Sequence, residues 1–228
     1  MNKKICYRNQ KGLTLIEMTV TYFSLLLMLS MAFAFWGNMK IGSSIQQSQI
    51  DTRQNMRNAI NFLQRDVRKA GYVIPNVNVT ISGQVFNTPS AGETAQSILF
   101  AIPENNNSGS ITYTVMGYFL EKNSKTIDGN EIILDEVNPE AYNLKRIEIK
   151  GVIPETPDRP ETINLSSLQG GSFRTAAQYI DKDLFFFYLS DDGDYVNVNA
   201  AFKKRQQPNS RYESNSQLAT ISLRNKRL

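Results

Sequence analysis

The residues of this sequence that could do chemistry are carboxylates, because it contains no histidine and a single cysteine, Cys6. A Ser-His-Asp or Cys-His centre is therefore impossible, and a chain trimmed after residue 12 would lack the usual zinc ligands. Seventeen of the acids lie between Tyr72 and Phe202, so a catalytic pair of carboxylates is the one arrangement left open. No Gly-rich phosphate loop is present. We expect no enzyme and no cofactor.

A cluster of three aspartates, Asp191, Asp192 and Asp194, could offer oxygen ligands to a calcium ion. Their spacing does not follow an EF-hand loop, and the Asp192-Gly193 pair is a signal for a tight hairpin. These residues are weak candidates for metal binding. We expect a solvated hairpin turn and no metal.

Glu17 is the carboxylate with the most unusual surroundings, since it is the one charged residue between Leu13 and Trp36. As a helix, these 24 residues would measure about 36 Å and could cross a hydrocarbon core of about 30 Å. Four cations and no acid precede them in residues 1–12, which favours a cytoplasmic N-terminus and an external remainder. A carboxylate inside such a segment normally has a partner or a role.

A simple membrane anchor explains the length, the apolar composition and the flanking charge of this segment, but it does not explain Glu17. Cleavage between Gly12 and Leu13 would create an amine at Leu13, one helical turn from Glu17. In an assembly of parallel helices, Glu17 of one subunit could then pair with the Leu13 amine of the next.

The heptapeptide Lys11-Gly12-Leu13-Thr14-Leu15-Ile16-Glu17 resembles the processing site of type IV pilins and of type II secretion pseudopilins. The resemblance implies that a prepilin peptidase cuts between Gly12 and Leu13 and N-methylates Leu13. It also implies that Glu17 is the assembly residue and that the helix leaves the membrane lipid for a filament core. Leu13 departs from the commoner Phe, and Leu is tolerated there.

The next segment, Ile45 to Ala70, predicts an amphipathic helix, because apolar residues recur at spacings of three and four. Gly37 and Gly42 are expected to weaken the helix before it, and Gly71 is expected to end it. We expect Leu63 and Val67 to face a sheet. The charged residues expected to be solvated are Arg65, Asp66, Arg68 and Lys69.

Residues 58–72 resemble the end of the long helix in PilW-type minor pilins, which reads close to F-L-x-R-D-[IVL]-R-x-A-G-Y. Pseudopilin J of type II secretion has a comparable R-D-[IVL]-R stretch. The segments F-F-Y-L-S-D-D-G-D-Y, from Phe186, and L-A-T-I-S-L-R, from Leu218, also look like the last strands of these two groups. Within the pilin-like proteins, the resemblance points to PilW-type minor pilins and to pseudopilin J. It implies a type IV pilin-like fold.

The rest of the chain, residues 72–228, predicts a β-rich globular domain with long loops at Pro103–Ser110 and Pro154–Ser172. The run Leu184–Leu189 is apolar on both faces, so we expect a central strand covered by the helix. The predicted strands are Ser97–Ile102, Ile111–Leu120, Glu131–Asp135, Leu144–Val152, Asp183–Ser190, Tyr195–Asn199 and Gln217–Leu223. The predicted fold class is α+β, with a long N-terminal helix packed on an antiparallel sheet. Its parts are a leader (1–12), a transmembrane helix (13–36), an amphipathic helix (37–71) and the β domain.

Charge is segregated along the chain: residues 72–202 carry eight cations and seventeen acids, whereas residues 203–228 carry seven cations and one acid. The basic end, with Lys203–Arg205 and Arg224–Arg227, could touch DNA. Tyr212 is the one aromatic residue among those cations, which argues against nucleic acid as a partner. A solvated tail, or docking onto an acidic neighbouring domain, is the expected role.

Together these features predict a PilW-like minor pilin in a bacterial inner membrane, with its globular domain outside the cytoplasm and later in a pilus at the cell surface. The resemblance implies partners: prepilin peptidase, other minor pilins, the major pilin, the inner-membrane assembly platform and, before assembly, membrane lipid. The resemblance also implies that the chain joins a priming or tip complex with other minor pilins. The alternatives are a pseudopilin J-like component of type II secretion and, from another class, an adhesin or DNA-binding head on the filament.

Overall fold

The structure, a computed structural model, describes residues 14–105, 111–127, 130–156, 159–206 and 211–223 of the 228-residue chain. Its contacts define two compact units, one that ends at Ser44 and one that begins at Ile45. The first holds the apolar start of a long helix, and the second holds the rest of that helix with an antiparallel sheet. The predicted α+β fold is confirmed.

Helix α1 (Leu15–Lys69) is continuous through Gly37 and Gly42, where we expected a weaker helix. Its C-terminal end joins the sheet directly. The Ala70 N–H still donates to the Asp66 carbonyl oxygen (3.0 Å), and the Gly71 N–H donates to the carbonyl oxygen of Ala101 (3.0 Å) in a neighbouring strand. The helix therefore ends at Lys69, just before the predicted stop at Gly71, because the chain turns there into the first strand.

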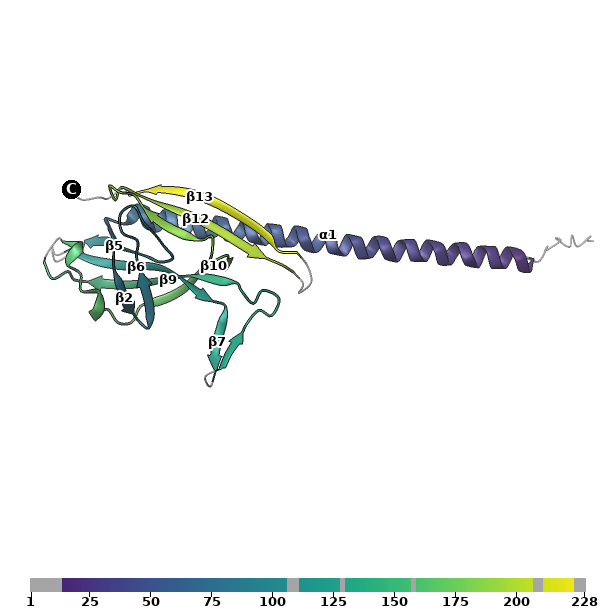
Figure 1. Cartoon of the computed structure of the whole chain (residues 1–228), viewed down its shortest axis with the longest axis horizontal. Coiled ribbons are helices and arrows are strands. Elements are labelled where there is room, and N and C mark those ends of the chain that lie inside the picture. The colour runs from purple at the N-terminus through teal and green to yellow at the C-terminus, as the bar shows by residue number, and fades with distance from the viewer. Residues whose placement is uncertain (1–13, 106–110, 128–129, 157–158, 207–210, 224–228) are drawn as a thin grey trace, which may run out of the picture. The chain divides into compact units, whose positions relative to one another are not determined.

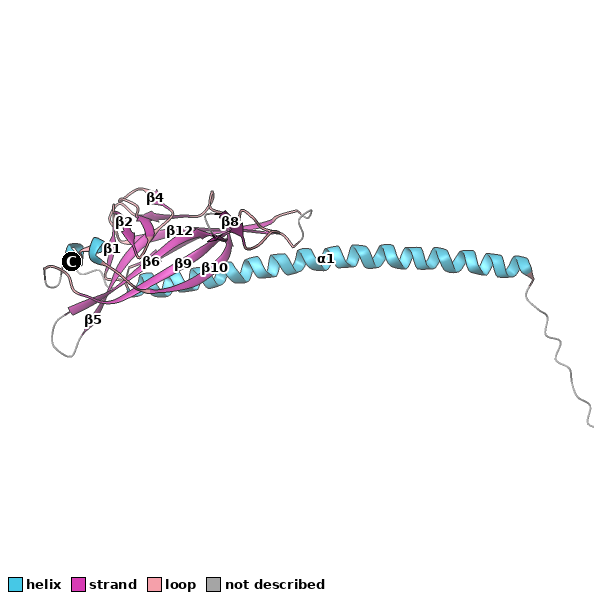
Figure 2. Cartoon of the chain, turned by 90° about the horizontal axis from the view of Figure 1, so that it is seen from below, coloured by secondary structure: helices cyan, strands magenta, loops and turns pink. Residues whose placement is uncertain are grey.

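The main sheet is antiparallel and, within the described residues, has nine strands (Figure 2). The strands are β1 (Tyr72–Ile74), β4 (Thr94–Ala95), β5 (Ile98–Asn105), β6 (Ile111–Lys122), β9 (Tyr142–Val152), β10 (Ser172–Ile180), β11 (Phe186–Leu189), β12 (Tyr195–Lys204) and β13 (Glu213–Ser222). Their order is β1-β5-β6-β9-β10-β12-β11-β4, and β13 also pairs with β12.

Two small hairpins and two short helices accompany this sheet. One hairpin is β2 (Asn78–Ile81) with β3 (Gln84–Asn87), and the other is β7 (Ser124–Ile127) with β8 (Asn130–Ile133), which projects away from the main sheet (Figure 1). The 3-10 helices η1 (Pro160–Thr162) and η2 (Leu165–Ser167) lie in the segment predicted as a long loop.

The sheet has two parts that meet at one residue pair, Ile180 of β10 with Phe202 of β12. Helix α1 packs on one face across both parts. Its residues Leu63 and Val67 share a core with Phe100 and Tyr118 of the first part and with Phe187 of the second. The helix thus holds together two sheet parts that have little backbone pairing of their own.

The opposite face of the first part is covered by the β2–β3 hairpin and the η1–η2 segment. Ile81, Phe86 and Ile163 pack there against Leu99 and Ile147. A second core results, so the strands in the middle are buried on both faces. Strand β6 shows this as an unbroken run of buried residues from Thr112 to Phe119.

The strand Leu184–Leu189 differs from its prediction. Only Phe186–Leu189 form β11, which lies between β12 and the two-residue β4 near an end of the sheet. Leu184 is 53% exposed. Phe187 and Leu189 do pack in the core that contains α1, so the helix covers one face of this strand, but the strand is not central.

Gly117 in β6 is a position where the core leaves no room for a side chain. A Cβ atom there would lie 2.7 Å from the Phe86 ring and 2.8 Å from side-chain atoms of both Leu99 and Ile147. We expect Gly117→Ala to lower the free energy of unfolding by about 1–3 kcal/mol through overpacking. Urea denaturation of the full chain in detergent measures this. Gly42→Ala, where a Cβ has no atom within 4 Å, serves as the control, and an equal loss in both variants would contradict the packing account.

Candidate assembly site

Helix α1 begins with a capping box around Glu17. Thr14 donates its backbone N–H (2.9 Å) and its hydroxyl (3.0 Å) to Oε2 of Glu17, and the Glu17 backbone N–H donates to the Thr14 hydroxyl oxygen (3.3 Å). Such a reciprocal pair satisfies N–H groups that have no partner inside a helix. Our prediction did not include this motif, although Thr-x-x-Glu is visible in the sequence.

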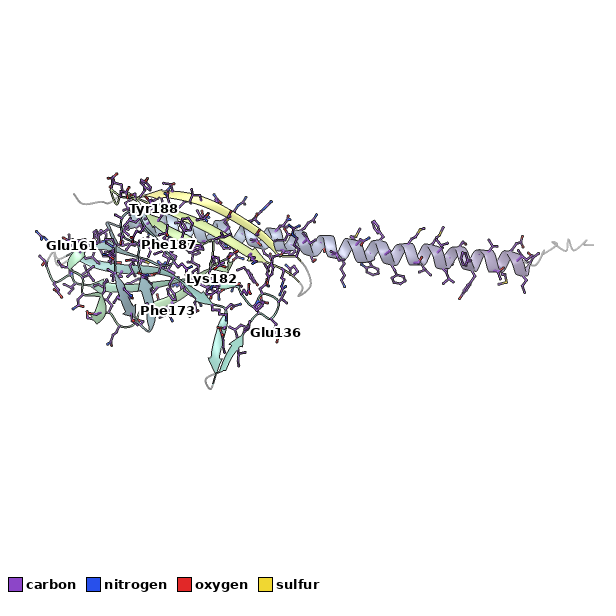
Figure 3. The ribbon with its side chains drawn as sticks, viewed as in Figure 1. Glu136, Glu161, Phe173, Lys182, Phe187 and Tyr188 are labelled. Atoms are coloured by element: carbon purple, nitrogen blue, oxygen red, sulfur yellow. The ribbon has the colours of Figure 1, made fainter. Side chains whose placement is uncertain are left out.

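The helix around and after Glu17 presents apolar side chains on all sides (Figure 3). Every residue from 14 to 43 is exposed in the isolated chain, including Leu15, Phe23 and Trp36. By length and composition, α1 is able to cross a membrane. An apolar surface of this extent indicates contact with lipid or with other apolar helices. The predicted processing residues, Gly12 and Leu13, lie outside the described part of the chain.

A buried charge network connects the second half of α1 to the sheet. Oδ2 of Asp66, a residue that is 1% exposed, accepts hydrogen bonds from Arg146 Nε (2.6 Å) and from the Tyr118 hydroxyl (2.7 Å). Arg146 Nη1 donates to Oε2 of Glu148 (2.7 Å), and Arg65 Nε donates to Oδ1 of Asp66 (3.2 Å). These contacts join α1, β6 and β9 in the interior of the domain.

The surroundings of Tyr118, Arg146 and Glu148 shift their pKa values. Burial, followed by the negative charge of Asp66, raises the pKa of the Tyr118 phenol, so the hydroxyl stays a donor. Burial alone would lower the pKa of Arg146, but hydrogen bonds to Asp66 and Glu148 outweigh it and raise that pKa. The hydrogen bond from Arg146 lowers the pKa of Glu148.

The burial of Asp66 corrects our prediction that this residue is solvated. Asp66 follows Leu63 by three residues, and this spacing places both side chains on the helix face that meets the sheet. A carboxylate is tolerated there because Arg146 supplies a matching charge and a hydrogen bond. Arg68 and Lys69 are exposed as predicted, and Leu63 and Val67 are buried.

A second set of polar contacts holds α1 to the end of β12. Lys204 Nζ donates to Oδ2 of Asp51 (2.6 Å), and the Ser48 hydroxyl donates to the carbonyl oxygen of Lys204 (3.3 Å). Gln49 Nε2 donates to Glu213 of β13 (3.1 Å). These contacts lie far along the chain from the Asp66 network, so α1 is fixed at two points.

The Asp51–Lys204 pair predicts a dependence of stability on pH. The hydrogen bond from Lys204 lowers the pKa of Asp51 below its ordinary value of 3.8. A group with a lowered folded-state pKa adds stability above the unfolded-state pKa and loses it as the pH falls through the folded-state value. We expect Lys204→Met to reduce the stability lost between pH 7 and about pH 3, measured by urea denaturation. The same loss in Lys204→Met and the parent chain would contradict this role.

The basic end of the chain is used partly for internal contacts. Cationic groups of Lys203 and Arg205 lie 4.7 Å and 4.5 Å from the centre of the Tyr212 ring. Arg205 Nε also donates to the carbonyl oxygen of Val137 (2.6 Å). The predicted basic cluster Arg224–Arg227 lies outside the described residues. Three of the four described cations of this end, Lys203, Lys204 and Arg205, are therefore engaged by the fold, which weakens the DNA-binding alternative.

The turn at residues 191–194 joins β11 to β12, and the predicted hairpin is confirmed. The Ser190 hydroxyl accepts the N–H groups of Asp194 (3.0 Å) and Tyr195 (3.1 Å), and the Gly193 N–H donates to the Ser190 carbonyl oxygen (2.9 Å). Gly193 has a φ of 65°, which glycine adopts without strain. In the part of the chain that the structure describes, no group of three or more His, Cys, Asp or Glu could hold a metal ion.

Comparisons with protein-family models, with curated proteins and with solved structures find no match to this chain. A functional assignment therefore depends on its own residues and geometry. The chain has a long N-terminal helix with an apolar start, packed on an antiparallel sheet, and this architecture is consistent with that of pilins.

Proposed function

We propose that this chain is a minor pilin that takes part in the assembly of a type IV pilus. The observation that carries the proposal is Glu17, a carboxylate in the first turn of an apolar helix that is exposed on all sides. In this proposal, prepilin peptidase cuts between Gly12 and Leu13 and methylates the new amine of Leu13. The subunit waits in the inner membrane with its β domain outside the cytoplasm, and then enters the filament at the cell surface.

The geometry at Glu17 allows this carboxylate to cap the helix in the single chain and to bind an amine in the assembled filament. In the single chain, Thr14 provides two hydrogen bonds to the carboxylate, both to Oε2. An ionised carboxylate has about four lone-pair sites on its two oxygens, so it can accept an ammonium while it still caps the helix. In a filament core, the low dielectric would strengthen the attraction to the Leu13 amine of a neighbour.

The β domain supplies the contacts with other subunits in this proposal. The buried Asp66–Arg146 network and the Asp51–Lys204 contact hold that domain on the helix that enters the filament. Its partners would be other minor pilins in a priming or tip complex, the major pilin and the inner-membrane assembly platform. The role is structural, not enzymatic, and requires no cofactor.

A second candidate is a minor pseudopilin J of a type II secretion system. The segment Arg65-Asp66-Val67-Arg68 supports it equally, because the resemblance at these residues extends to both groups. In both proposals, Asp66 attaches the helix to the sheet and Glu17 acts in assembly. They differ in the assembly that the subunit joins, which is a type IV pilus in the first proposal and a type II secretion system in the second.

Deletion of the gene in its host separates the two candidates. The pilin proposal predicts loss of surface pili, and a tagged copy that restores them should be recovered in filaments sheared from the cells. Normal piliation with loss of protein secretion would overturn the pilin proposal in favour of pseudopilin J. Normal piliation with normal secretion would contradict both.

A further inference from the structure

The β7–β8 hairpin is an arm that projects from the main sheet (Figure 1), and an ion pair between Lys122 of β6 and Glu131 of β8 (2.8 Å) joins it to that sheet. Its two strands, of four residues each, pair only with one another within the described chain. An isolated two-stranded hairpin is marginally stable in water. Contact with another molecule would therefore stabilise it.

The second strand of this arm and the residue after it expose three consecutive large apolar side chains. Ile132, Ile133 and Leu134 are 45%, 37% and 63% exposed. Successive residues of a strand point to opposite faces, so Ile132 and Ile133 present apolar groups on both sides of the arm. The paired strands of a domain usually have at least one face packed, whereas Ile132 and Ile133 of this arm are both exposed.

Acidic residues follow the apolar ones directly. Glu136 lies beside the arm (Figure 3), and Glu136 and Glu140 are both exposed, although the charge of Glu140 also acts on Lys122. We define the arm surface as Ile132, Ile133, Leu134, Glu136 and Glu140. It combines an exposed apolar strip with negative charge.

The solvent face of α1 in the same unit has the complementary composition. Arg53, Arg57 and Arg68 are exposed and form no ion pair with described residues, and they share this face with Ile50, which is 49% exposed. We define the basic helix face as these four residues. The two acids in this part of the helix do not neutralise the arginines of the basic helix face, because Asp51 pairs with Lys204 and Asp66 is buried.

We propose that the arm surface of one copy of this chain docks on the basic helix face of a second copy. Apolar side chains would meet apolar side chains, and Glu136 and Glu140 would meet arginines. The two surfaces are different, so each copy can contact one neighbour through its arm and another through its helix. A contact of this head-to-tail kind generates rings or helical filaments. The inference rests on the proposed function, in which the subunit stands beside others in a filament.

Cysteine cross-linking of the full chain in detergent tests this contact. In a Cys6→Ser background, one tagged copy carries Ile133→Cys and a differently tagged copy carries Asn61→Cys, an exposed residue on the same side of the helix as Arg57. After mixing and oxidation, we expect at least about fivefold more disulfide-linked heterodimer than with the control pair Val85→Cys and Asn61→Cys. Val85 is 63% exposed and lies in β3, so it is more accessible than Ile133 (37% exposed), and low accessibility cannot explain a lower yield from the control pair. Equal yields from the two pairs would overturn the proposal.

A charge swap tests the electrostatic part. Arg53→Glu with Arg57→Glu in the Asn61→Cys copy should lower the yield, and Glu136→Lys with Glu140→Lys in the Ile133→Cys copy should restore it. The yield from unswapped copies should also fall with added salt, because exposed charges are screened. A swap without effect, or a cross-link that appears only with a different pilin subunit in cells, would overturn docking between copies.

These outcomes are separate from those that test the proposed function. Absence of the cross-link in a chain whose processed N-terminus is methylated Leu13 would refute the arm contact alone. A specific cross-link in a chain that is never processed would refute the pilin proposal and leave the contact standing.

Discussion

Asp66→Ala is expected to lower the free energy of unfolding of the globular domain by about 3–5 kcal/mol, because it leaves the buried Arg146 guanidinium without its partner. It also removes the acceptor for the Tyr118 hydroxyl. Urea denaturation of the full chain in detergent, followed through the far-ultraviolet signal of the β domain, measures the loss. The effect should exceed that of Gly117→Ala, since an unpaired buried charge costs more than overpacking.

Arg65→Ala provides a matched control for this prediction. Arg65 contacts the same carboxylate at 3.2 Å, but its side chain is 52% exposed, whereas that of Arg146 is 8% exposed. An exposed ion pair contributes about 0–1 kcal/mol, so Arg65→Ala should have little effect. Similar losses for Asp66→Ala and Arg65→Ala would contradict the account of the buried network.

Glu17→Ala is expected to leave membrane insertion intact and to reduce incorporation into filaments at least about tenfold, because the amine of a neighbour would then be buried without its partner. The measurement compares the amount of the variant in the membrane fraction with the amount in sheared filaments. Unchanged incorporation would remove the assembly role from Glu17.

Two further variants separate assembly from helix capping. Glu17→Gln keeps a residue that can complete a capping box but removes the charge, so we expect it to fail in incorporation as Glu17→Ala does. Thr14→Ala removes the capping hydroxyl but keeps the carboxylate, and we expect it to be incorporated. The opposite pattern would show that Glu17 matters only as a cap.

Elements with a strong local pattern could be predicted from the sequence. The apolar run and the spacing of Leu63 and Val67 predict α1, and dense β-branched and aromatic residues predict β5, β6 and β9. Strand β10 was missed because Ser172–Thr175 are all exposed and its sequence lacks alternation. The short strands β1 to β4 and β7 carry little pattern of their own.

The residues of the candidate site also differ in whether a local sequence pattern predicts them. Glu17 could be singled out from the sequence because the two features that mark it, a carboxylate within an apolar run and a fixed spacing from Gly12, lie within one short segment. The burial of Asp66 depends on Arg146, which is 80 residues away in the chain, and no local pattern reports that contact. The arm was visible only as the predicted strand Glu131–Asp135, because its separation from the main sheet is a property of the topology.

The mass of the N-terminal peptide of the mature protein, purified from its host, tests the central claim most directly. The account predicts a chain that begins at Leu13, with the mass of one added methyl group on its α-amine. A mature protein that begins at Met1 or at any residue other than Leu13, or that carries an unmethylated Leu13, would contradict it.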